Sequence, residues 1–563
     1  MEVHLSHSRD GRTGWAKLDT LPRFLRNCLF LLAVSILSAV LLIPLFPSAS
    51  RLNETGLLFR PYRLSVWESV ESALERIRKL QQERGEQGSE ANTSTPLLPE
   101  VSPETKEKFR VDYASRYGGP PPLLLTEVWL PYALENRCLV QHEMYDKIRR
   151  DLTPFRDILK QRGEREGLTE LRRILGNAVN AAGGGTELRV VDFQDGKVAF
   201  FGLPFSKRRT RERLCEPLAP LLPSMTTVWN IFDEPKVLPI EEQRAASVAD
   251  RWNDFVFSPW KIKEEGGGEK TNTSSPFFRG SHFVEQRCRN LEEYERRKRL
   301  HGFFRWNPSP IFTDELLPVF SQTKPVEAAG CRFADMIVPS DYYVEPGLVA
   351  AQLDASEGGD WEGKKPTIFW RGSTTGAGHS WLMALSGSVE ESHRVRVVNF
   401  VNDPTRNVFW NRTDVGFGGS SLGVVQADPL GSLWVHWKSF LWDRVSKDEM
   451  YKRQVLLDID GNTFSQRIVP FWMRSGSVVL KVESLFEDWF SGLMKEGEHF
   501  VSVRLDLSDW NERVGSIWSS PEKTVEMIRR AEETSRRFMR IEDMRCFLLR
   551  VLLEFHSVFS GHW

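Results

Sequence analysis

Two polar stretches that follow apolar runs contain the residue types that bind phosphate. The first is TIFWRGSTTGAGHSW (367–381), whose candidate residues are Arg371, Ser373, Thr374, Thr375, Gly376 and His379. Glycines let backbone N–H groups approach an anion closely, and an arginine offers a fixed fork of donors for phosphate oxygens. The stretch matches neither GxGxxG nor GxxxxGK[ST]. A plain tight turn therefore stands as the alternative to a phosphate site.

The second stretch is VLLDIDGNTFSQRIVPFWMRSGSVVLK (455–481), which predicts a strand, a polar loop and a further strand. Its loop contributes the candidates Asn462, Ser465 and Arg467. Two strand ends would then each present glycine, serine and arginine, and two arginines could neutralise a diphosphate that gains charge as it leaves. Asp458 and Asp460 have the DxD spacing of carboxylates that hold Mn²⁺ or Mg²⁺, although such residues equally cap turns.

A carboxylate suited to proton transfer occurs in NIFDEPKVLP (230–239). Asp233 and Glu234 stand at the expected end of a strand, before Pro235. One of these carboxylates at the edge of a cleft could act as general base towards a hydroxyl group, and a solvated turn is the alternative. In CRFADMIVPSDYY (331–343), Asp335 and Tyr342 are expected to shape the same cleft.

The elements that must position these residues follow an alternating pattern. Residues 188–202 predict a β-hairpin around Asp195-Gly196. Strands are predicted at 334–338, 367–370, 395–400, 455–459, 477–481 and 500–505, with helical stretches between several of them. This alternation favours an α/β fold with a largely parallel sheet. From Pro521 onwards, apolar residues such as Val525 and Ile528 predict one or two amphipathic helices that pack on the body.

Composition and the N-terminal region narrow the class of protein. The net charge of −1 over 563 residues argues against a nucleic-acid partner. Cys28–Phe46 has no charged residue over 19 positions and follows five Lys/Arg, which predicts an uncleaved anchor with a cytosolic N-terminus. A signal peptide is the alternative. Sequons at Asn53, Asn92, Asn272 and Asn411 fit a lumenal body. Five later cysteines could form two disulfides and leave one thiol, and the absence of CxxC makes zinc an unexpected ligand.

The motifs FWRGSTTG, LLDIDGNTFSQR…SGSVVLK, EDWF…HFVSVRLDLSD, ADMIVP and NIFDEP occur in the order expected of one family. Over roughly residues 225 to 515, the sequence resembles the capsule-associated-protein family of glycosyltransferases, glycosyltransferase family 90. That family includes protein O-glucosyltransferases and fungal β-xylosyltransferases.

The resemblance implies a GT-B-like architecture of two Rossmann-like halves facing a cleft. The expected parts are a cytosolic tail (1–27), an anchor (28–46), a stem (47–106), an acceptor-side half (107–350), a donor half (351–515) and C-terminal helices (516–563). The family's catalytic aspartate lies in an N-x-x-D-x-P motif, which implies Asp233. Its UDP-sugar site uses the loop Ser373–His379 and the loop from Asn462 through Ser465 to Arg467. Its protein O-glucosyltransferases carry arginine at the position of His379 and lack the DxD pair, so no metal is implied, although a divalent cation stays possible.

The expected function is that of an inverting glycosyltransferase. It would move xylose or glucose from a UDP-sugar to a hydroxyl of a glycan or glycoprotein in the lumen of the Golgi or ER, as a single-pass type II membrane protein. A catalytically silent carbohydrate-binding or scaffold protein on the same fold is the alternative. A metal-dependent transferase that uses Asp458 and Asp460 is a third possibility.

Overall fold

The computed structural model describes residues 67–87, 98–182, 187–239, 277–279, 302–303, 311–326, 332–344, 359–376, 391–418, 441–443 and 445–562. All of them lie in the compact unit Arg63–Trp563. The predicted anchor Cys28–Phe46, His379 and three of the four sequons lie outside the described residues. Among the helices that are described, none is long and apolar enough to cross a membrane.

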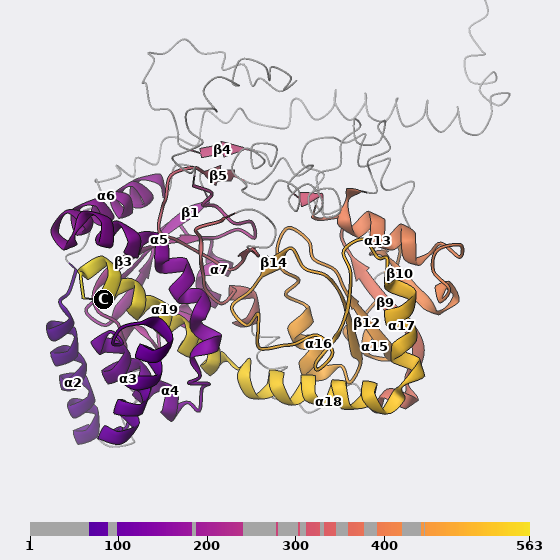
Figure 1. The fold of residues 1–563 in the computed structure, drawn as a ribbon, viewed down its shortest axis with the longest axis horizontal. Coiled ribbons are helices and arrows are strands. Elements are labelled where there is room, and N and C mark those ends of the chain that lie inside the picture. The colour runs from indigo at the N-terminus through magenta and orange to yellow at the C-terminus, as the bar shows by residue number, and fades with distance from the viewer. Residues whose placement is uncertain are drawn as a thin grey trace, which may run out of the picture. The chain divides into compact units, whose positions relative to one another are not determined.

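Helices and strands alternate along the chain (Figure 1). The α-helices are α2 (Val70–Gln87), α3 (Pro103–Tyr117), α4 (Leu130–Glu135), α5 (Asp146–Arg162), α6 (Glu164–Ala181), α7 (Phe205–Cys215), α13 (His393–Val401), α15 (Lys447–Tyr451), α16 (Ile468–Arg474), α17 (Trp510–Ser519), α18 (Pro521–Phe538) and α19 (Ile541–Ser560). Short helical turns are η3 (Leu125–Trp129), η4 (His142–Tyr145), η5 (Ala219–Leu221), η9 (Asp341–Val344), η10 (Trp361–Gly363) and η12 (Trp410–Arg412).

The strands form two larger sheets and two short pairs. They are β1 (Leu188–Gln194), β2 (Lys197–Phe200), β3 (Met225–Asn230), β4 (Phe277–Arg279), β5 (Ile311–Thr313), β6 (Val319–Ser321), β7 (Lys324–Pro325), β8 (Met336–Ile337), β9 (Lys365–Gly372), β10 (Thr413–Gly418), β11 (Leu441–Trp442), β12 (Arg453–Asp458), β13 (Val478–Val482), β14 (Phe486–Glu487) and β15 (Val501–Val503). The short pairs are β4 with β5 and β7 with β14.

The first sheet has the strand order β2-β1-β3-β6-β8. Strands β1 and β2 are antiparallel, and Gln194 pairs with Lys197, so a two-residue turn joins them. Both turn residues, Asp195 (φ 49°) and Gly196 (φ 76°), have the positive φ that a type I′ turn requires. The predicted hairpin is therefore confirmed. Strands β3, β6 and β8 are parallel to one another, which directs the ends of β3 and β6 to one edge of the sheet.

The second sheet has the order β11-β10-β9-β12-β13-β15, and all its strand pairs are parallel. Numbered along the chain, these strands run 3-2-1-4-5-6, the order of doubly wound dinucleotide-binding sheets. In such sheets a crevice opens where the strand order reverses, which here lies beyond the carboxyl ends of β9 and β12. The predicted α/β class with a parallel sheet is confirmed. Five of the six predicted strands overlap observed ones: β8 in the first sheet, and β9, β12, β13 and β15 in the second.

The strand predicted at 395–400 is wrong, because these residues belong to helix α13 (Figure 1). The alternation of arginine and valine in Arg394–Val397 resembles the period of a half-buried strand. In the structure almost every residue of this helix is buried, so the core covers both the valines and the arginines. Tertiary packing thus overrides the strand preference of β-branched residues.

Helix α18 begins as predicted, with Pro521 in its first turn. It contacts α16 and β13, whereas α19 contacts α5, α6 and α7 beside the first sheet. Both helices are drawn in yellow in Figure 1. Val525 was expected on the packed face of α18 and is instead 36% exposed. Most residues of α19 are fully buried, which makes this helix part of the core rather than a surface addition.

Residues assigned to the stem also contribute to the folded unit. Helix α2 lies between residues 47 and 106, and its Arg76 donates a hydrogen bond to the Pro220 carbonyl at 3.0 Å. Arg76 also pairs with Glu68 at 3.1 Å. Described residues from 67 onwards therefore belong to the folded unit, well before the boundary expected at residue 107.

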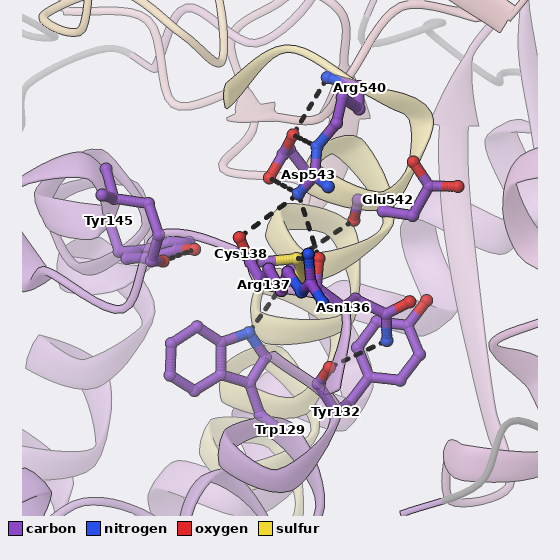
Figure 2. The surroundings of a disulfide bond; sticks show 11 residues. Trp129, Tyr132, Asn136, Arg137, Cys138, Tyr145, Arg540, Glu542 and Asp543 are labelled. Atoms are coloured by element: carbon purple, nitrogen blue, oxygen red, sulfur yellow. Dashed lines mark hydrogen bonds and ion pairs between the residues drawn. A yellow bond between two sulfur atoms is a disulfide. The ribbon is translucent and has the colours of Figure 1, made fainter. Parts of the chain in front are cut away.

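A disulfide joins the loop after α4 to helix α19, between Cys138 and Cys546 (Figure 2). Arg540 supports this junction, because it donates to the Asn136 carbonyl at 3.0 Å and pairs with Asp543 at 2.9 Å. Among the described cysteines, Cys215 is a buried free thiol. This arrangement fits the expectation of disulfides together with one unpaired cysteine.

Candidate active site

A cleft of about 220 Å³ opens at the crevice beyond the ends of β9 and β12. The loop 461–467 after β12 forms one wall. The remaining lining residues are Asp233, Tyr342, Thr375 and Arg394. The structure thus brings together Asp233 from the end of β3 with residues from both predicted phosphate-binding stretches, although more than 80 residues separate these segments in the sequence.

Arg394 at the start of α13 forms the floor of this cleft, and its side chain holds two loops together. Its guanidinium donates to the carbonyl and hydroxyl of Ser373 at 3.0 and 3.2 Å and to Thr375 Oγ1 at 2.6 Å. It also donates to the carbonyls of Asp460 and Ile459 at 2.8 and 3.1 Å. Each of these acceptors belongs to a segment that follows β9 or β12. This role of Arg394 was not predicted from the sequence, because residues 395–400 were assigned to a strand.

Arg394 and Arg467 place two guanidinium groups at one cleft. Burial, and then the neighbouring Arg467 guanidinium, lower the pKa of Arg394 to about 9. Arg467 donates to the carbonyl of Arg371 at 2.6 Å. Within the described parts of the chain, neither arginine forms an ion pair with a carboxylate. The Asp460 and Asp458 carboxylates act on Arg394 in the opposite direction, but less strongly than burial and Arg467. The two cations repel each other, so a bound anion would be stabilised here.

Glycine permits the close approach of the loops around this floor. A side chain at Gly461 would place its Cβ 2.8 Å from both Arg394 Nη2 and Thr375 Oγ1. Gly376 has a φ of +104°, which residues with a side chain rarely adopt, and it lies against the backbone of Gly461. The glycines therefore bring the two loops together, which differs from the sequence-based interpretation that they wrap around phosphate.

Asn462 links the two sides of the cleft through its carboxamide. Its Oδ1 accepts the N–H of Gly376 at 3.0 Å, and its Nδ2 donates to Glu234 Oε1 at 3.1 Å. Burial raises the pKa of the Glu234 carboxyl. The structure thus gives Asn462 a place between the loop after β9 and the turn after β3. Asn462 also lines the cleft, and its contact with the donor stays a prediction.

The carboxylates of the DxD pair are occupied by protein groups. Lys481 Nζ lies 2.7 Å from Asp458 Oδ2 and 3.1 Å from Asp460 Oδ1. The hydroxyl of Ser465 donates to Asp458, and that of Ser484 donates to Asp460. Among the described residues, no group of three His, Cys, Asp or Glu side chains could hold a metal ion. Ser465 lines the cleft, and its hydroxyl is bonded to Asp458. Ser465 therefore holds the loop in place.

Arg371 has a different environment from the one its motif suggested. Its guanidinium forms an ion pair with Asp414 and donates to the Asp414 carbonyl at 2.7 Å. The guanidinium carbon lies over the Phe369 ring, 5.0 Å from its centroid. Arg371 is not among the residues that line the cleft. Of the neighbouring candidates, Thr374 is buried and Ser373 is half-buried beside Arg394.

The turn that carries Asp233 is fixed by Asn230, the first residue of the N-x-x-D-x-P motif. Asn230 Nδ2 donates to the Glu234 carbonyl at 2.6 Å, and its Oδ1 accepts the N–H of Phe232 at 3.0 Å. These two bonds close a turn that leaves Asp233 exposed at the mouth of the cleft. Gln322 Nε2 donates to Asp233 Oδ1 at 2.8 Å.

The family model described as Glycosyl transferase family 90 matches residues 347–560. Residues 347–560 are similar to glycosyl transferase family 90. The resemblance recognised in the sequence is thereby confirmed for the second sheet and the loops after β9 and β12. The match also covers α18 and α19, which lie beyond the end of that resemblance near residue 515. The motif that contains Asp233 precedes the matched residues, so its assignment rests on the geometry of the turn and on the motif itself.

Two curated relatives are distant. Protein O-glucosyltransferase 3 of Mus musculus and that of Rattus norvegicus are each 25% identical over 107 residues. These residues make up 19% of this chain, and the chain spans 21% of the length of either relative. Both relatives have names that agree with the family match.

Several residues of the site escaped the sequence analysis. They are Arg394, Gln322, Ser340 and Gln466. A helical reading of 393–401 could have identified Arg394 as a polar residue inside an apolar helix. No pattern marks Gln322, because a single glutamine in a three-residue strand region carries no periodic signal.

Proposed function

We propose that this protein is an inverting glycosyltransferase that transfers glucose or xylose from a UDP-sugar to a hydroxyl of a glycan or glycoprotein. The observation that carries the proposal is the pair Arg394 and Arg467, two guanidinium groups without a carboxylate partner in the described structure, at the same cleft as Asp233. The similarity of residues 347–560 to glycosyl transferase family 90 supports it, and the names of the distant relatives favour a glucosyl donor.

In the proposed reaction, the carboxylate of Asp233 takes the proton of the acceptor hydroxyl. The acceptor oxygen forms a bond to the anomeric carbon on the face opposite UDP, and the bond from that carbon to the phosphate oxygen breaks. UDP leaves with the bonding electron pair, so negative charge grows on its diphosphate. Arg394 and Arg467 stabilise that charge, which is the form of catalysis that prepositioned donors provide. An α-linked donor gives a β-linked product.

We assign the stabilisation of the diphosphate to side chains of the protein rather than to a divalent cation. Lys481 supplies the positive charge that Asp458 and Asp460 require. The remaining carboxylate oxygens accept hydrogen bonds from serines. A metal-dependent transferase built on this pair would have to displace Lys481. Undiminished UDP release in excess chelator would agree with this assignment.

The proposed architecture is GT-B-like, with residues 107–350 on the acceptor side, 351–515 on the donor side and 516–563 as C-terminal helices. The proposed location is the Golgi or ER, as a type II membrane protein anchored by residues 28–46. The Cys138–Cys546 disulfide supports an oxidising compartment. The exposed sequon residue Asn411 also fits a lumenal body. An endoglycosidase-sensitive mass shift that is smaller in an Asn411→Gln variant than in the wild type would support this topology, because three other sequons remain.

The central experiment separates proton transfer from donor binding. UDP release is measured with UDP-glucose and UDP-xylose, and UDP affinity is measured by calorimetry. We expect Asp233→Asn to abolish transfer and to leave UDP affinity nearly unchanged, because the carboxylate acts on the acceptor. Asp195→Asn is the matched control. Asp195 is also an exposed aspartate in a turn, and it is distant in the sequence from the residues that line the cleft. Equal loss of both properties would refute the role of Asp233, and no turnover with any donor would favour a scaffold protein.

A further inference from the structure

The carboxylate of Asp233 lies at the end of a chain of hydrogen bonds that crosses the cleft. Gln322 Nε2 donates to Asp233 Oδ1 at 2.8 Å. Gln322 Oε1 accepts the hydroxyl of Ser340 at 2.6 Å. Ser340 Oγ in turn accepts Gln466 Nε2 at 2.9 Å. Gln466 belongs to the loop 461–467, which also carries Arg467. The chain therefore connects the proposed base with the proposed donor loop.

All the hydrogen bonds in this series run in one direction, from Gln466 to Asp233. Glutamine Nε2 can only donate, so Gln466 donates to Ser340, whose single hydroxyl proton is then available for Gln322. The Nε2 of Gln322 donates to Asp233 at the end of the chain. Hydrogen bonds arranged in series polarise one another, and the bond to a charged acceptor is the strongest of them. The Asp233 carboxylate is thus the charged acceptor at which the series of hydrogen bonds ends.

Burial makes this arrangement rigid. Gln322 is 7% exposed and Ser340 is 1% exposed, whereas Asp233 is exposed. A buried polar group without its partner is costly, so Gln322 and Ser340 are held in these orientations. Among the described residues, the second oxygen of the Asp233 carboxylate has no hydrogen-bond partner. One carboxylate oxygen is therefore fixed by the protein, and the other is left for a hydroxyl in the cleft.

From this arrangement we infer that Gln322 is a positioning residue for Asp233 and that Ser340 and Gln466 hold it in place from the donor loop. The inference rests on the proposed function, because it assigns Asp233 the role of base. Gln322 does not contact the reacting atoms in this account. Gln322 orients the Asp233 carboxylate. The side chain of Gln322 is itself held, through Ser340, by Gln466 of the loop that is proposed to bind the departing diphosphate. Loss of Gln322 should therefore slow the chemical step without weakening donor binding.

The test compares Gln322→Leu with Asp233→Asn in the full-length chain. The probes are UDP-glucose and UDP-xylose, with water as the acceptor, and the readouts are kcat and KM for UDP release together with UDP affinity. We expect Gln322→Leu to lower kcat about 10- to 100-fold, as supporting residues of a reacting group typically do. The KM and the UDP affinity should stay within about twofold of the wild-type values. Ser340→Ala, which removes only the second member of the chain, should lower kcat by a smaller factor.

Gln454→Leu is the matched control. Gln454 is a glutamine of similar burial, 6% exposed, whose two ends also form hydrogen bonds, to the Trp361 carbonyl and Trp518 Nε1. It lies outside the cleft, so its kcat should equal that of the wild type. Should Gln322→Leu fail to fold, Ser340→Ala decides the matter by the same readouts.

The outcomes separate this inference from the proposed function. If Asp233→Asn keeps its UDP release, the proposed function fails. If Asp233→Asn loses UDP release and Gln322→Leu keeps the wild-type kcat, the inference alone is overturned. A fall in UDP affinity or a rise in KM that matches the fall in kcat would also overturn it, because a merely structural residue would act in that way.

Discussion

Substitution of Arg394 by methionine should remove most of the affinity for UDP. The guanidinium of Arg394 is only 6% exposed, so water screens its charge little. Truncating one partner of a buried, hydrogen-bonded charge pair costs about 2–5 kcal/mol of binding free energy. The middle of that range corresponds to a dissociation constant for UDP raised by roughly 100-fold or more. Arg394→Lys keeps the charge but loses the planar fork, and it should give an intermediate affinity.

The same substitution also affects the fold, and this effect can be separated from binding. The carbonyls of Ile459 and Asp460 lose a donor, at about 1–3 kcal/mol for each group left without a hydrogen bond, whereas the cost of burying a charge disappears. Arg396→Met is the matched control for stability. Arg396 is a buried arginine of the same helix that donates to the Leu505 carbonyl at 2.8 Å and lies outside the cleft. It should change the melting temperature and leave UDP affinity unaltered.

Arg371→Met provides the sharpest comparison, because the motif pointed to Arg371 and the structure points to Arg394. Arg371 is directed to Asp414, which retains Arg453 as a second partner at 3.2 Å. We expect its substitution to change the UDP dissociation constant by less than about threefold. Calorimetric titration of UDP into each folded variant is the measurement. Our reasoning would be refuted if Arg371→Met weakened UDP as strongly as Arg394→Met, or if Arg394→Met bound UDP like the wild type.

Two further predictions concern stability. Burial lowers the pKa of His556 to about 4, below its ordinary value near 6.5, so its stabilising contribution is complete above pH 6.5 and is lost as the pH falls towards 4. Between pH 7 and pH 4.5, protonation of His556 should lower the free energy of unfolding by about 2 kcal/mol. His556→Gln should reduce the measured loss, and an equal loss in both proteins would contradict this. Cys138→Ala opens the disulfide to Cys546, 408 residues away, and should lower the free energy of unfolding by about 4–5 kcal/mol, measured by urea denaturation. Cys215→Ala, at the buried free thiol, serves as its control: it keeps the disulfide and should lose stability in reductant, whereas Cys138→Ala should not respond.

The part of the site that could be predicted from sequence is local. The hairpin at Asp195-Gly196 and strands β9, β12 and β13 follow from turn residues and short apolar runs. Once β9 and β12 are neighbours in a parallel sheet, the loops after them must meet at one edge. Sequence reasoning therefore placed Thr375 and Arg467 at the cleft lining.

The part that could not be predicted depends on contacts between distant segments. An arginine after a strand can point to the cleft or away from it, and Asp414 decides the direction of Arg371 from 43 positions further along the chain. The glycine pattern likewise looked like a phosphate cradle, although the glycines permit loop contact around Arg394. Short hydrophobic patterns fix elements, whereas the partners of charged side chains are fixed only by the assembled fold.

The charges of the cleft are arranged so that the roles of its two sides stay separate. On the donor side, Arg394 and Arg467 form no direct ion pair in the described structure, because Lys481, rather than an arginine, pairs with the DxD carboxylates. On the opposite side, the partner of Asp233 is the neutral amide of Gln322. An arginine at the position of Gln322 would form an ion pair with the carboxylate and lower its pKa, which would make it a weaker base. A neutral donor orients the carboxylate without supplying a counter-charge. This separation explains why a buried glutamine, which no sequence pattern marks, is the residue we expect to control the rate.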